Sequence, residues 1–184
     1  MNISNIGSKI TFGGSDYSEF IPTNLRIGAA LMVPIDEYNR FTIAADANKL
    51  LVPTVPKKGD DETQEAYEQR KITDYYDVSS IAGIFKSFSD APGGFKEELQ
   101  EIQWSVGAEY IYHDKFALRA GYHDQSANKG NLKYFTVGAG FKMSVFSLDC
   151  GYVIATAKSN PLDQTLRFSL SFDMDGIKDL FKRR

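Results

Sequence analysis

The chain has 184 residues, enough for one substantial domain, and carries a net charge of −3 with a pI near 5.4. This weak acidity argues against a nucleic-acid-binding protein, which would show a basic patch or stripe. No window approaches 18 consecutive apolar residues, so no membrane-spanning helix is predicted. Cys150 is the only cysteine, so the sequence predicts neither an internal disulfide nor a cysteine zinc cluster.

Apolar and polar residues alternate in eight segments, the period of strands that have one apolar face. Most segments reach the ~9–11 residues that a tilted strand needs to cross a bilayer. Short turns and longer loops alternate strictly between them, which indicates an up-and-down antiparallel meander with two different ends. The strands are predicted at 3–12, 23–33, 39–48, 102–113, 115–123, 133–143, 145–156 and 164–172. The short turns fall at 34–38, 113–115 and 144, and the longer links at 13–22, 49–101, 124–132 and 157–163.

The longest link, 49–101, predicts an insertion with helical parts. Its start, VPTVPKKGDDETQEAYEQR, is polar and predicts a solvated loop. Residues 77–88 then place apolar side chains at helical spacing behind Ser79 or Ser80 as the N-cap, and KEELQEI predicts one further short helix. The insertion either packs over one end of the sheet or forms a docking surface for a partner. The apolar positions of the first helix are Ile81, Ile84, Phe85 and Phe88.

The last segment, 173–184, stops alternating and is predicted to be a tail outside the sheet portion, 1–172. If that portion belongs to an outer-membrane β-barrel, the tail would be periplasmic. Ile177, Leu180 and Phe181 would share one face of a short helix. Three aspartates and Gly176 are loosely similar to a calcium loop, but the closing glutamate of an EF-hand is missing. A solvated tail is the favoured interpretation.

The polar face is predicted to point into a barrel lumen and the apolar face outward into lipid. Small residues such as Gly107 and Gly121 flank isolated charges, a pattern that suits a crowded polar interior in which charges pair. Aromatic residues, among them Phe12, Trp104 and Phe172, gather toward strand ends, where interfacial girdles lie. A soluble barrel of lipocalin type, with the apolar face inside, is the alternative. The predicted lumen-facing charges are Lys9, Arg26, Asp46, Glu109, Arg119, Lys142, Asp149 and Arg167.

No catalytic constellation is present in the sequence. The two histidines, His113 and His123, lie at opposite ends of one predicted strand, about 33 Å apart at ~3.3 Å per residue. No serine occupies a nucleophile-elbow pattern, and Cys150 falls in the lipid-facing set. We therefore expect a protein that is not an enzyme and that needs no metal or other cofactor.

Several stretches resemble PorV, the outer-membrane β-barrel family of the Bacteroidetes type IX secretion system, which has PorQ relatives. The SFSDAPGGF sequence ahead of a Trp-bearing strand is the most specific of them. The stretches are NISNIGSKI (2–10), FIPTNLRIGAA (20–30), ANKLLVPTVP (47–56), GIFKSFSDAPGGFKEELQEIQWSVGAEY (83–110), KYFTVGAGFK (133–142) and NPLDQTLRFSLSF (160–172).

The resemblance implies a FadL-like transmembrane barrel of about fourteen strands, of which this chain would be the C-terminal portion. The start, MNISNIGSKITF, lacks the features of a signal peptide, so we expect that an export signal precedes the sequence given. A closed eight-stranded barrel is the alternative.

Proteins of this family bind cargo bearing a C-terminal sorting domain and pass it from the translocon to the surface attachment complex. The partners implied are secreted cargo, translocon and attachment-complex proteins, and outer-membrane lipid. A FadL-like transporter for hydrophobic small molecules is the alternative function. The residues that would form part of the cargo-binding mouth are Ser89, Asp90, Ala91, Pro92, Gly93, Gly94 and Phe95.

Overall fold

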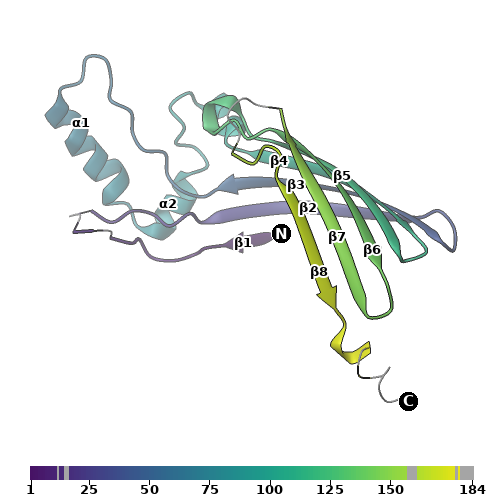
Figure 1. Ribbon diagram of the computed structural model, residues 1–184. Helices are drawn as coiled ribbons and strands as arrows, with labels where there is room; N and C mark the ends of the chain where they lie inside the picture. Colours follow the sequence, from purple (N-terminus) through teal and green to yellow (C-terminus); the bar gives the residue numbers. More distant parts are fainter. Residues whose placement is uncertain (12, 15–16, 157–160, 177, 179–184) are drawn as a thin grey trace. The chain divides into compact units, whose positions relative to one another are not determined.

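The computed structural model of the protein describes residues 1–11, 13–14, 17–156, 161–176 and 178. Eight strands form one sheet in the order β1 to β8, so each strand neighbours the next in the chain (Figure 1). The registered pairs are antiparallel, which confirms the predicted up-and-down fold class. Within the described residues the sheet is open, because no pairing joins β1 to β8. No helix in this part of the chain is long and apolar enough to cross a membrane.

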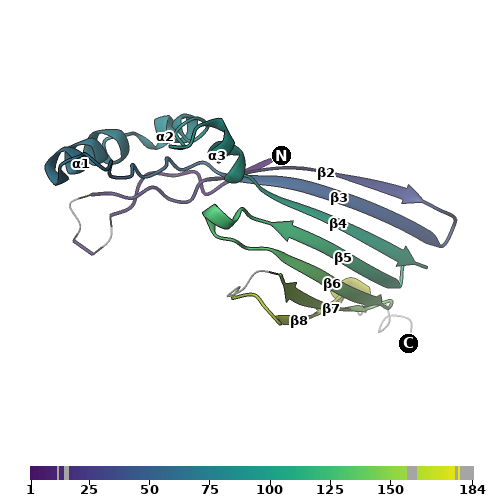
Figure 2. The same cartoon turned by 90° about the horizontal axis from the view of Figure 1, so that it is seen from above.

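Seven of the eight predicted strands are present within a few residues of their expected bounds. The strands are β1 (Asn2–Ser4), β2 (Asn24–Pro34), β3 (Asn39–Leu50), β4 (Gln103–Tyr112), β5 (Phe116–Asp124), β6 (Tyr134–Lys142), β7 (Phe146–Ala155) and β8 (Leu166–Phe172). The helices are α1 (Gln64–Lys71), the π-helical turn η1 (Ile72–Tyr76), α2 (Ser80–Lys86), α3 (Phe95–Gln100) and the 3₁₀ turn η2 (Ala127–Lys129). Figure 2 shows α1, α2 and α3 following one another along the insertion.

The prediction of a first strand over 3–12 is wrong, because β1 contains only three residues. Asn5 adopts a φ of 55°, outside the extended region, and its carbonyl accepts a hydrogen bond from Thr23 Oγ1 at 2.8 Å. Further along, Ile10 forms only an isolated bridge with Glu19. The expected girdle residue Phe12 lies outside the described residues.

The prediction of a solvated loop ahead of α2 is also wrong, because that stretch contains α1. Thr63 is the N-cap, and its hydroxyl accepts a hydrogen bond from the Ala66 N–H at 3.3 Å. Glu65 in the first turn and Arg70 and Lys71 in the last turn complement the helix dipole. The helix has no buried residue, so its sequence carries no apolar periodicity to reveal it.

The chain divides into two compact units. The first contains Met1–Ile27 and Ala47–Gln103, and the second contains Gly28–Asp46 and Trp104–Arg184. Every described residue that is buried lies in the first unit, where Leu51, Tyr75 and Ala91 form the apolar part of the core. The described strands of the second unit contain no buried residue, so that unit is a sheet without a core of its own.

The tight turns of the second unit are built on backbone that L-residues seldom adopt. His113 and Asp114 join β4 to β5 with φ values of 56° and 57°. The His113 N–H donates to the Tyr38 carbonyl at 2.7 Å, and the two rings stack with centroids 4.2 Å apart. This turn is therefore tied to the turn between β2 and β3. His113 is a turn residue, as its place in the sequence indicates.

Candidate functional site

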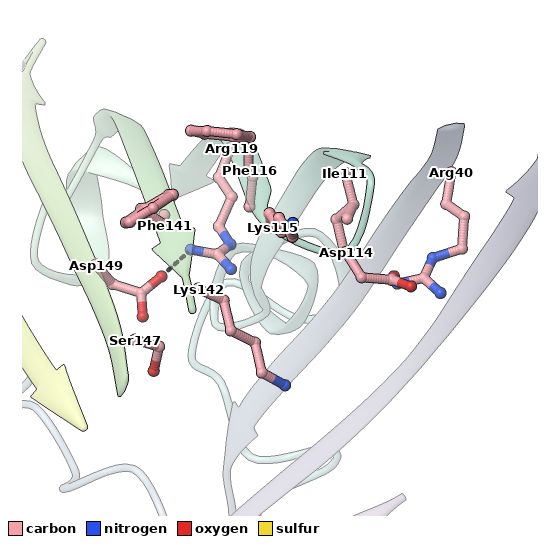
Figure 3. A pocket seen from close by; sticks show the side chains of 12 residues that line it. Arg40, Ile111, Asp114, Lys115, Phe116, Arg119, Phe141, Lys142, Ser147 and Asp149 are labelled. Carbon is pink, nitrogen blue, oxygen red and sulfur yellow. Dashed lines mark hydrogen bonds and ion pairs between the residues drawn. The ribbon is translucent and has the colours of Figure 1, made fainter. Parts of the chain in front are cut away.

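One face of the second unit carries a three-membered ionic network centred on Arg119. The register places Glu109 opposite Arg119 on β4 and β5. Arg119 donates from Nε to Glu109 Oε2 at 2.6 Å. Its Nη1 donates to Asp149 Oδ1 at 2.6 Å (Figure 3). The guanidinium thus links β4, β5 and β7 across the intervening β6. A Cβ on Gly140 of β6 would lie 2.6 Å from Asp149 Oδ1, so glycine keeps this path open.

A cavity of about 470 Å³ lies beside this network, at the end of the unit where the short turns are. Arg40 and Asp114 form an ion pair in its wall. Lys115 and Lys142 also line the cavity, and neither forms an ion pair with another described residue (Figure 3). This end of the polar face therefore carries an excess of cations.

A second cavity, of about 480 Å³, lies on the same face. Its lining comes from β3, β4, β5 and β6. Asp46, Glu109, Arg119 and His123 contribute ionisable groups to it. Ser105 Oγ and His123 Nδ1 lie 3.0 Å apart in its wall. The two cavities make the polar face the sheltered side of this unit.

The opposite face of the sheet consists of apolar side chains, and these are more exposed than the side chains of the polar face. Leu118 is 61% exposed and Phe168 is 65% exposed, whereas most polar-face positions of β4, β6 and β7 are half-buried. Tyr122 and Phe135 on adjacent strands have ring centroids 4.6 Å apart, so the apolar side chains are neighbours rather than scattered. An extended apolar surface of this kind requires an apolar covering.

Of the other predicted lumen charges, Lys142 lines the first cavity and Asp46 lines the second. Lys9 lies outside any strand, and its Nζ donates to the carbonyls of Tyr75 at 3.3 Å and Tyr76 at 2.7 Å. Arg26 lies on β2, Asp46 on β3, Lys142 on β6 and Arg167 on β8. Glu109, Arg119 and Asp149 are joined directly by hydrogen bonds.

In the first unit, the loop of residues 89–95 is anchored on a buried cluster. Lys49 is only 8% exposed, and its Nζ lies 3.1 Å from Glu98 Oε2 and 2.6 Å from Glu101 Oε2. The other oxygen of Glu98 accepts a hydrogen bond from the Ala91 N–H at 2.7 Å. Asp90 Oδ2 accepts one from the Thr54 N–H at 2.7 Å. The start of the loop is thereby fixed to β3, to the chain that follows it, and to α3.

Burial raises the pKa of the Asp90 carboxyl, and the nearby charges of Glu98 and Glu101 act in the same direction. The hydrogen bond from the Thr54 N–H opposes this shift but does not cancel it. The cluster therefore brings the carboxylates of Glu98 and Glu101 around one buried ammonium group, with the Asp90 carboxyl close enough to feel their charges. Sequence reasoning missed the cluster because Lys49 and Glu98 are 49 positions apart.

The second half of the loop is exposed. The Gly93 N–H donates to Glu97 Oε2 at 2.7 Å, and Gly94, with a φ of 66°, is the N-cap residue of α3. Phe95 follows and is 77% exposed. Of the predicted mouth residues, Asp90 and Ala91 thus hold the loop in place, whereas Pro92–Phe95 present it to the surroundings.

Helix α2 turns its small residue inward and its large apolar residues outward. A Cβ on Gly83 would lie 2.6 Å from Phe20 Cε1 and 3.0 Å from Pro53 Cγ, so only glycine allows this close packing. Ile81 and Phe85 are both 71% exposed as a result. Phe88 after α2 and Leu99 of α3 are also exposed. The insertion therefore presents several exposed apolar side chains on its surface.

The described part of the chain contains no group of three or more His, Cys, Asp or Glu side chains placed to hold a metal ion. Its features define a class: an antiparallel up-and-down sheet protein with an exposed apolar face, a sheltered ionic face and a helical insertion.

The family model described as "Type IX secretion system protein PorV" matches residues 1–57. This match confirms the resemblance for the part of the chain that runs from β1 through β3 to the segment containing Thr54. Three of the resembling stretches, 2–10, 20–30 and 47–56, lie inside it. The match supports a component of the type IX secretion system. No curated protein matches the chain.

Proposed function

We propose that this protein is an outer-membrane component of type IX protein secretion that binds cargo through its C-terminal sorting domain. It would pass the cargo from the translocon to the surface attachment complex as a carrier, without catalysing a reaction itself. The single observation that carries the membrane part is the sidedness of the second unit: its apolar face is the exposed one, and its ionic network is on the sheltered face.

The burial pattern gives this proposal its physical basis. A sheet without a buried core does not remain folded in water, because burial of apolar surface is the main favourable term in folding. Hydrocarbon around the apolar face would supply the missing burial, and antiparallel strands with charged residues on the enclosed side suit a membrane barrel. Lipid also demands that every strand edge be paired, so the open edges of β1 and β8 require further strands.

The cargo-binding part rests on the loop of residues 89–95 and the helices beside it. A rigid anchor built from Lys49, Glu98 and Asp90 holds a loop whose far half is exposed, and α2 and α3 add exposed Phe85 and Phe95. Large exposed aromatic side chains on a fixed scaffold are typical of residues that carry binding energy at protein interfaces.

The experiment is a binding assay between the purified chain in detergent and a cargo sorting domain. Replacing Phe85 and Phe95 by serine removes apolar contact area without touching a buried residue, so we expect weaker binding with unchanged unfolding. Replacing Ile35 and Met143, exposed residues of the turns between β2 and β3 and between β6 and β7, by serine is the matched control. Equal affinity for the wild type and the Phe85/Phe95 variant would remove the helices from the proposed interface.

A further inference from the structure

A third cavity, of about 450 Å³, lies within the first unit, beside the anchored loop. Ser89, Asp90 and Pro92 of the loop form part of its wall. The rest of the wall includes three basic side chains, Lys57, Arg70 and Lys86. None of the three is predicted as a site residue from the sequence.

Two of the basic groups are held in place by neighbouring residues, and the charge of Arg70 is balanced by Glu62. Arg70 donates from Nε and Nη2 to the two oxygens of Glu62 at 2.9 and 2.7 Å, and from Nη2 to the Lys57 carbonyl at 2.8 Å. Lys86 Nζ donates to the backbone carbonyl of Asp74 at 2.7 Å, a neutral acceptor. Both cations are therefore fixed before any ligand arrives.

The third basic group is available for a ligand. The ammonium group of Lys57 forms no ion pair with another described residue, and the residue is exposed. The carboxylates in the wall are those of Asp74 and Asp90. Asp90 already accepts a hydrogen bond from the Thr54 N–H at 2.7 Å. The lining thus offers donors to an incoming anion.

We propose that this cavity binds a carboxylate group of the cargo polypeptide, held by Lys57 and Lys86. The proposal rests on the proposed cargo-binding function, whose loop forms one wall of the cavity. Ammonium groups bind carboxylates through short, charge-assisted hydrogen bonds, which are about twice as strong as neutral ones. The carboxylate belongs either to the C-terminus of the sorting domain or to an acidic side chain within it, and the two sources present the same chemistry.

The test uses the full chain in detergent and a cargo sorting domain with a fluorescent label at its N-terminus, with fluorescence anisotropy as the readout. We expect Lys57→Glu to weaken binding about tenfold or more, since an ion pair becomes a repulsion. Lys58→Glu is the matched control, because Lys58 is an exposed lysine next to Lys57 that does not line the cavity. We expect it to bind like the wild type.

Two further probes identify the source of the carboxylate. A sorting domain with a C-terminal carboxamide loses affinity if the chain terminus occupies the cavity, and Asp/Glu→Asn/Gln versions lose it if a side chain does. Wild-type binding that none of these changes alters would overturn the carboxylate site and leave cargo binding intact. A wild-type chain that binds no sorting domain would overturn both proposals.

Discussion

Arg119 and Asp149 are joined by a 2.6 Å hydrogen bond although they lie on β5 and β7, with β6 between them. The two side chains meet over Gly140, whose missing Cβ would lie 2.6 Å from Asp149 Oδ1 and 3.1 Å from Arg119 Nη1. Gly140 is therefore needed because it leaves room for the contact between Arg119 and Asp149, and not because its backbone adopts an unusual angle. This relationship makes the ionic face a cross-strand network instead of a set of adjacent pairs.

Gly140→Ala is expected to lower the free energy of unfolding by about 1 kcal/mol, because the added methyl group displaces one partner of the pair. The measurement is thermal or denaturant unfolding in detergent. Gly151→Ala is the control, since a Cβ there has no closer neighbour than the Val137 carbonyl at 3.9 Å. Equal losses for the two variants would show that the network does not depend on the space above Gly140.

Lys49→Met is expected to destabilise the first unit by roughly 3–5 kcal/mol, because it leaves the buried carboxylate of Glu98 and the half-buried carboxylate of Glu101 without their cation. The measurement is the rate of proteolytic cleavage in residues 89–95, which should rise as the loop loses its anchor. Lys58→Met, at an exposed lysine, is the control and should change neither cleavage nor unfolding. A Lys49→Met loop as resistant as the wild type would show that Asp90 and Thr54 suffice to hold it.

The strands could be predicted because apolar and polar residues alternate along each of them, one kind for each face of the sheet. β4 to β7 follow that rule, and their bounds agree with the predicted ones within a few residues. The first strand could not be predicted in the same way, because the alternation of 3–12 does not show that Asn5 takes a positive φ and that Lys9 turns toward Tyr76. Helix α1 could not be predicted because it has no buried residue, so its sequence lacks the apolar periodicity that indicates a helix.

The candidate sites were predictable only in part. The ionic residues of β4, β5 and β7 are visible as charges on the polar face, but their joining through Arg119 depends on register and on Gly140. The motif of residues 89–95 is recognisable, whereas its anchor on Lys49 and the cation-lined cavity beside it unite segments far apart in the sequence. Contacts between distant segments leave no periodic signal, so sequence reasoning did not reach them.

Ser79→Ala is expected to destabilise α2 by about 1 kcal/mol, because the Ser79 hydroxyl accepts the Ala82 N–H at 3.3 Å as the N-cap. The sequence left Ser79 and Ser80 as equal candidates, and the structure places the cap on Ser79. Ser80→Ala is the control. Amide hydrogen exchange at Ala82 and Gly83 is the measurement, and similar exchange in the two variants would contradict the assignment.

Asp90 is expected to make the first unit less stable as pH rises. Its pKa is raised in the folded state, so the folded state binds the proton more tightly than the unfolded one. Below the ordinary pKa of aspartate, about 3.9, Asp90 is protonated in both the folded and the unfolded state, so it does not make the stability depend on pH there. As pH rises from there through the raised pKa, the unfolded state loses its proton first, and stability falls.

Asp90→Asn tests this dependence, because its side-chain carbonyl still accepts the Thr54 N–H but does not titrate. The unfolding temperature of the variant relative to wild type should increase from pH 4 toward neutrality. Glu62, whose pKa is lowered to about 2, chiefly by its hydrogen bond with Arg70, acts in the opposite direction in both proteins and cancels in the difference. Parallel pH profiles would show that Asp90 does not titrate differently on folding.

Leu118→Lys tests which face meets lipid. Leu118 is 61% exposed on the apolar face, and a lysine at the middle of a membrane strand costs about 2–4 kcal/mol on the lipid side. Ser169→Lys places the same charge on the face that carries Asp149, its registered neighbour on β7. After folding into phosphatidylcholine vesicles, the protease-resistant fraction should fall for Leu118→Lys and stay near wild type for Ser169→Lys. The reverse order would place the ionic face against lipid, because a charge is tolerated only where water or a counter-charge is available.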